Sequence, residues 1–182
     1  MSASADARGH ARAAAAFAVV AVRQGLPLES ADILPTIIPA KFNPEPDVLR
    51  TQIASASARL NQAEADAWLD ALPDPAAVAK FTALATTAGA LCISDGKEGK
   101  SAGGDSQQDA LYTMWLIARV LDYDEPEARG RWIMQRVMAA LEILVQDGEA
   151  AWDRVRAELE QRGRLTGDEV RALVAESDAQ SK

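Results

Sequence analysis

Apolar residues recur at helical spacing along most of the chain, and the segments with this pattern are separated by stretches rich in glycine, proline and polar residues. The first segment covers residues 6–24 and places Ala13, Phe17 and Val20 on one face, with Gly25 as a C-terminal stop. Its side chains are mostly small, so a neighbouring element can approach it closely. The pattern therefore predicts a core helix at the start of the chain.

The next stretch changes from helical to extended character. Pro27, Pro35 and Pro39 exclude a long helix, because proline lacks the backbone N–H and restricts the residue before it. Isoleucine and leucine fill much of the space between these prolines and suit an extended backbone. We predict one short strand or extended arm over residues 32–38.

Helical spacing returns after this stretch and continues to the end of the chain. Residues 110–121 are apolar on nearly every side, so we place that helix at the centre of the fold. The four tryptophans fall at core-like spacing, and we expect them to serve packing: Trp68, Trp115, Trp132 and Trp152. The helices expected after the extended stretch cover residues 43–60, 61–72, 76–91, 106–121, 126–147, 149–163 and 166–175.

Two of these helices have a clear start signal. Asp74 is a cap residue directly before Pro75, a favoured first helical residue. Thr166 and Glu169 have the spacing of a capping box, in which each side chain bonds the backbone N–H of the other residue. The apolar residues that flank this box have the spacing of a hydrophobic staple: Leu165 and Val170.

Length and composition indicate one mainly α domain over residues 1–182, with a core at about 6–175 and a frayed tail at 176–182. The chain of 182 residues is 48% hydrophobic, which supports one core of ordinary size. A net charge of −8 argues against binding to nucleic acid or to an anionic membrane surface. A single cysteine excludes an internal disulfide, so we expect a cytoplasmic protein.

The alanine-rich first segment is too short for a membrane anchor. Arg12 and Arg23 bracket its apolar run, which as a helix spans about 15 Å, whereas the hydrocarbon core is about 30 Å thick. Asp6 is also unusual for a secretory signal. We therefore expect no membrane partner for this segment.

The polar stretch from residue 94 to 101 approaches a phosphate-binding loop. It ends in Gly-Lys-Ser, but Ser94 stands where the first glycine of G-x-x-x-x-G-K-[ST] is needed. A solvated loop is the simpler interpretation. The alternative is an enzyme or a protein that binds an anionic ligand at the loop of residues 93–105, through Lys97, Lys100 and Ser101.

Residue counts limit the other chemistry. His10 is the single histidine, which rules out zinc or di-iron motifs that need two histidines from one chain. Cys92 and His10 are the only possible thiol and imidazole pair, and a structural cysteine explains Cys92 more simply. We predict no catalytic residue, no metal ligand and no cofactor.

Two distant segments resemble one protein family. AAAAFAVVA at residues 13–21, followed by GLPL at 25–28 and an extended stretch ending at Pro35, resembles the active-site helix of FtsH-type zinc metalloproteases, H-E-A-G-H-A-V-V-A, with its G-x-P-[VL] and strand. LEQRGRLTGDEV at residues 159–170 is similar to the closing helix, turn and helix of that family. The resemblance covers about residues 11–176 and implies a helical protease scaffold.

The chain departs from that family at the zinc site. Ala13, Ala14 and Phe17 stand where the family has its first histidine, its glutamate and its second histidine. The family's third ligand, an aspartate, corresponds to Gln108 or Asp109. Apolar residues at the ligand positions close a polar hole that would otherwise leave unsatisfied groups. The resemblance thus implies an extinct active site.

The leading hypothesis is a catalytically inactive, metalloprotease-like protein that acts in binding, regulation or assembly. FtsH-type domains form rings, so the resemblance implies a protein partner or self-association. The alternative to this scaffold is an unrelated helical bundle, such as a prophage accessory or inhibitor protein.

Overall fold

The computed structural model describes residues 5–32, 58–60, 67–68, 70–93, 104–147 and 149–180. Within these ranges the chain forms a mainly α domain with one small sheet, so the predicted fold class is confirmed. Its elements, in chain order, are α1 (Ala5–Arg23), β1 (Leu28–Asp32), β2 (Ala58–Leu60), α4 (Pro75–Gly89), the 3₁₀ turn η1 (Ala90–Cys92), α5 (Gly104–Val120), α6 (Pro126–Glu142), the π-helical turn η2 (Ile143–Asp147), α7 (Glu149–Arg162), β3 (Arg164–Thr166) and α8 (Gly167–Gln180).

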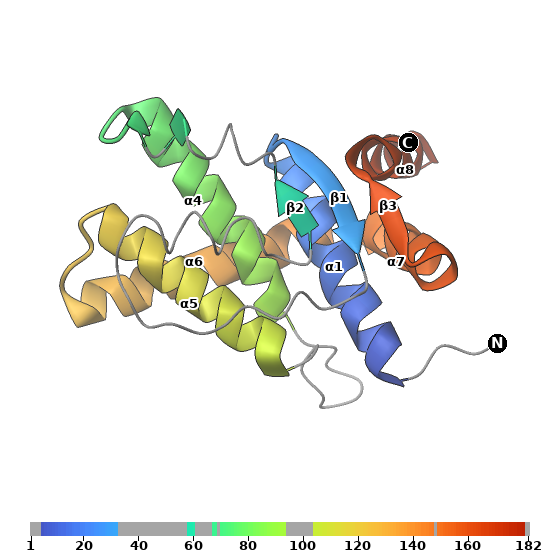
Figure 1. The fold of residues 1–182 in the computed structure, drawn as a ribbon, viewed down its shortest axis with the longest axis horizontal. Coiled ribbons are helices and arrows are strands. Elements are labelled where there is room, and N and C mark those ends of the chain that lie inside the picture. Colours follow the sequence, from blue (N-terminus) through green and yellow to red (C-terminus); the bar gives the residue numbers. More distant parts are fainter. Residues whose placement is uncertain are drawn as a thin grey trace.

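Helix α1 is the centre of the fold. Every residue from Ala13 to Ala21 is buried, with at most 4% of its surface exposed. Figure 1 shows α4, α5 and α6 on one side of α1, and α7, β3 and α8 on the other. Eight of these nine residues are alanine or valine, so neighbouring backbones can approach α1 from all directions.

The prediction that residues 110–121 form the central helix is wrong. Helix α5 buries one face through Met114 and Ile117, while Leu111 is 43% exposed and Arg119 is exposed. Side-chain size explains why α1, and not α5, lies at the centre. The large apolar residues of α5 make it hydrophobic on nearly every side, but the small residues of α1 allow other elements to pack closely around it.

The sheet has three antiparallel strands in the order β2-β1-β3. Strand β1 pairs with β2 through Ala31 and Ala58, and with β3 through Ala31 and Leu165. The extended segment expected at residues 32–38 overlaps the described structure only at Asp32, where β1 ends, and residues 33–38 lie outside the described ranges. Two further strands of three residues each were not expected.

Local chemistry marks the helix ends where it was predicted to do so. Gly25 follows α1 with a positive φ of 66°, the left-handed conformation that ends a helix. The Asp74 carboxylate accepts the N–H of Ala76 at 2.7 Å. At the start of α8, Thr166 N donates to Glu169 Oε2 at 2.7 Å, and Glu169 N donates to Thr166 Oγ1 at 3.3 Å. These ends are confirmed.

Three other boundaries differ from prediction. Residues 58–60 form strand β2 rather than the end of a helix, because they pair with β1; residues 43–57 lie outside the described ranges. Helix α5 begins at Gly104, two residues before the expected start at residue 106. The tail expected to fray at 176–182 is helical to Gln180, because Asp178 forms a bidentate ion pair with Arg23 of α1.

Candidate functional site

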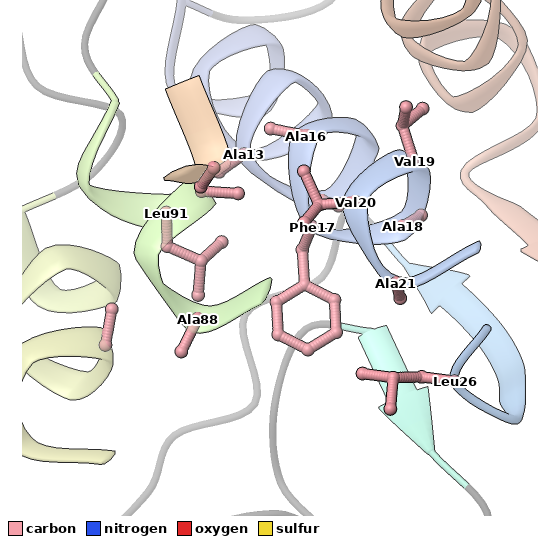
Figure 2. Packing of buried hydrophobic residues seen from close by; sticks show 14 of the residues in the cluster. Ala13, Ala16, Phe17, Ala18, Val19, Val20, Ala21, Leu26, Ala88 and Leu91 are labelled. Carbon is pink, nitrogen blue, oxygen red and sulfur yellow. The ribbon is translucent and has the colours of Figure 1, made fainter. Parts of the chain in front are cut away.

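The three residues that the resemblance sets against the family's catalytic positions lie inside the core on α1. Ala13, Ala14 and Phe17 are 4%, 0% and 3% exposed. Figure 2 shows the Phe17 ring pointing away from α1, with Ala88 and Leu91 on one side and Leu26 on the other. All of these residues belong to one hydrophobic cluster. The positions that the resemblance sets against the family's zinc ligands are therefore filled by packed apolar side chains.

The buried polar groups of the neighbouring helix offer no ligand to this region. Thr86 and Thr87 of α4 are buried, and their hydroxyls donate to carbonyls one turn earlier in the same helix. The bonds to Thr82 O and Ala83 O measure 3.0 and 2.9 Å. These hydroxyls complete the packing of α4 and do not form a polar pit beside Phe17.

Two features of the described residues limit catalytic chemistry. Burial raises the pKa of the Cys92 thiol to about 11, so it stays protonated at neutral pH and is a poor nucleophile. Among the described residues, no three or more His, Cys, Asp and Glu side chains gather as a metal ion would require. The donor set of a zinc protease therefore does not fit this part of the chain.

The remaining candidates fall where side chains are not described. Lys97, Lys100 and Ser101 lie outside the described ranges. Gln108 and Asp109 belong to α5, whose backbone is described from Gly104. The anionic-ligand loop therefore stays a prediction.

The two segments that carry the family resemblance lie side by side. Helix α1 packs against α7, and β1 pairs with β3, so residues 13–32 and 159–170 form one unit. Trp152 of α7 donates its Nε1–H to the Arg12 carbonyl at 3.0 Å, and the Arg12 guanidinium lies 4.5 Å from the centre of the Trp152 ring. Backbone pairing, packing and a cation–π contact thus join the chain's beginning to its end.

A glycine lets this unit close. At Gly167, an added Cβ would lie 1.8 Å from the Leu28 carbonyl oxygen, far inside contact distance. The same oxygen accepts a hydrogen bond from Arg171 at 3.3 Å. The glycine of the L-T-G-D-E sequence is therefore needed where the start of α8 meets β1.

Each of the four tryptophans has a cation beside its ring, which the sequence pattern did not suggest. Trp115 has two, since the guanidinium carbons of Arg119 and Arg129 both lie 5.3 Å from its ring centre. Trp132 is buried and the other three tryptophans are half-buried. Arg129 also donates to the Tyr123 and Asp124 carbonyls, so it orders the turn before α6. These contacts agree with a packing role.

The hydrophobic pattern did not predict an apolar surface that the structure exposes on α6 and η2. Met134 and Met138 of α6 are 60% and 55% exposed, and Val145 of η2 is 59% exposed. The signal was present in the helical spacing, because the two methionines share a face with Arg131 and Glu142, away from buried Trp132. This surface is the strongest candidate for an interaction site among the described residues.

Comparisons of the chain with protein families, with curated proteins and with solved structures find no match. One described segment, Pro75–Cys92, has the length and apolar character to cross a bilayer, but 61% of it is buried within the fold. Such burial is typical of the core helix of a soluble protein. The functional proposals below therefore depend on the buried residues of α1 and on the exposed face of α6.

Proposed function

We propose that this protein is a non-hydrolytic binding or assembly module built on a scaffold of the FtsH metalloprotease type, acting in the cytoplasm. The observation that carries the proposal is the burial of Ala13, Ala14 and Phe17 among apolar side chains. A working zinc site needs charged and hydrogen-bonded groups at these positions. Their apolar replacements preserve the packing of α1 and abolish the ligands.

The arrangement of the chain's ends supports the scaffold assignment. The resemblance joins two segments more than 120 residues apart in the sequence, and these segments pack and pair with each other. A chance likeness in alanine content would not require this proximity. The close approach of Gly167 to Leu28 gives the closing L-T-G-D-E sequence a structural reason within the same unit.

The first experiment measures zinc in the purified wild-type protein by elemental analysis, together with hydrolysis of unfolded casein. We expect less than about 0.1 zinc per chain and no hydrolysis, because α1 offers no ligand pair. Stoichiometric zinc, or zinc-dependent hydrolysis, would overturn the proposal.

A second experiment tests the scaffold by restoring ligands. The variant Ala13→His/Phe17→His/Gln108→Asp should bind zinc, and zinc should raise its Tm, because ligand binding to the folded state stabilises it. The matched control Ala15→His/Val19→His/Gln108→Asp places two buried histidines at the same spacing on the opposite face of α1. If both variants bind zinc equally, or neither does, the resemblance does not extend to the site and the scaffold assignment fails.

A further inference from the structure

Helix α6 presents an apolar stripe to solvent. It packs against α4 and α5 with one face (Figure 1), through residues that include the buried Trp132 and Ala140. On another face Met134 and Met138, one turn apart, are more than half exposed, and Val145 continues the same line on η2. We call Met134, Met138 and Val145 the α6 stripe. Methionine is a flexible, polarisable side chain that suits binding surfaces.

Opposite charges lie at the two ends of the methionine pair. Arg131 precedes Met134 by one turn, and Glu142 follows Met138 by one turn. Arg131 is 70% exposed, and its ion pair with Glu127 at 3.6 Å joins two solvent-exposed groups. Glu142 is exposed. These two charges are separated along the helix by about 16 Å.

We propose that the α6 stripe binds the α6 stripe of a second copy of this chain, with the two helices antiparallel about a twofold axis near Arg136. This inference rests on the proposed function and names the partner of the assembly module. The antiparallel register places Met134 opposite Met138 of the second copy. It also places Arg131 opposite Glu142 of the second copy, and by symmetry this ion pair forms twice.

The charge order selects this arrangement over the parallel one. In a parallel pair, Arg131 would face Arg131 and Glu142 would face Glu142, and like charges held opposite each other are unfavourable. The surface is therefore complementary to itself only when one copy is reversed. A single helix face buries a small area compared with most specific interfaces, so we expect the dimer to be weak and reversible.

Sedimentation equilibrium of the full chain tests the proposal. The average mass should rise above 19.4 kDa toward twice that value as concentration increases from about 10 μM to 1 mM, the range of a small interface. Arg131→Glu and Glu142→Arg should each raise the dimer Kd by about tenfold, because each substitution places two pairs of like charges opposite each other. An equimolar mixture of the two variants should restore association, since their charges complement each other in the antiparallel register.

Arg164→Glu is the matched control. It makes the same charge change on β3, where the Arg164 side chain is 67% exposed, and it should leave the dimer unchanged. A protein that stays monomeric at 1 mM overturns the proposal, and so does a dimer that Arg131→Glu or Met138→Asp leaves at wild-type strength. Circular dichroism confirms that each variant is folded. Failure here leaves the zinc and hydrolysis results unaffected, so it is distinguishable from failure of the proposed function.

Discussion

Replacing Phe17 with alanine measures how tightly the core is packed around this side chain. The ring is 97% buried, since 3% of the residue is exposed. A phenylalanine side chain covers roughly 150–250 Å², which at about 25 cal/mol per Å² gives an upper bound near 4–6 kcal/mol. Because alanine retains one carbon and the surroundings relax, we expect the free energy of unfolding to fall by about 3–5 kcal/mol.

Urea denaturation followed by circular dichroism gives this difference directly, and thermal unfolding provides a second readout. For a chain of this length, each kcal/mol changes the Tm by about 2–4 °C, so the Tm should fall by roughly 6–20 °C. Leu111→Ala is the control, because Leu111 is a large apolar side chain that is 43% exposed on α5. It should change the stability by less than about 1 kcal/mol.

A loss of less than about 1 kcal/mol for Phe17→Ala would refute the reasoning. It would mean that the ring lines a solvent-filled hole rather than filling the core. Zinc-dependent stabilisation of the wild-type protein would point in the same direction. Either result would make α1 a candidate active-site helix.

Three further predictions concern the unit formed by the chain's two ends. Gly167→Ala should lower the free energy of unfolding, measured by urea denaturation, by at least about 2 kcal/mol, because its Cβ would meet the Leu28 carbonyl. The control Gly130→Ala, in open space on α6, should raise it by about 0.5–1 kcal/mol. Trp152→Phe should cost about 1 kcal/mol through loss of the bond to the Arg12 carbonyl, and a neutral result would contradict that role. Hydrogen bonds from Thr166 N, Arg162 and the Thr166 hydroxyl lower the pKa of Glu169 from 4.5 to about 2. The ionised Glu169 therefore stabilises the folded state fully above pH 4.5, and this stabilisation is lost as the pH falls toward 2. The Tm of wild type should therefore fall more steeply than that of Glu169→Gln between pH 5 and about 2.5, and parallel curves would exclude this linkage.

Helix ends were predictable wherever the stabilising chemistry is local. Gly25, Asp74 and the Thr166–Glu169 box each act within a few residues, so the sequence contains the whole interaction. The tail after residue 175 shows the limit of such reasoning. It stays helical because Asp178 meets Arg23, which lies 155 residues earlier in the chain.

The sheet could not be predicted for the same physical reason. Strands β2 and β3 have three residues each, too few to show an alternating pattern. They become strands only through pairing with β1, which lies near residue 30, whereas β3 begins at Arg164. Helical spacing predicted a core face with Ala13 and Phe17, but apolar character alone did not distinguish α1 from α5 as the central helix.

The burial of α1 limits which surfaces are open to a partner. The residues of α1 from Ala13 to Ala21 are buried on all sides, so within the described part of the chain a partner would meet the outer helices rather than this segment. Among the described residues, large exposed apolar side chains concentrate on α6 and η2, where three of the five lie in the α6 stripe. The core around Phe17 and the α6 stripe consist of different residues. Met138→Asp and Phe17→Ala should therefore act independently, the first on association and the second on stability.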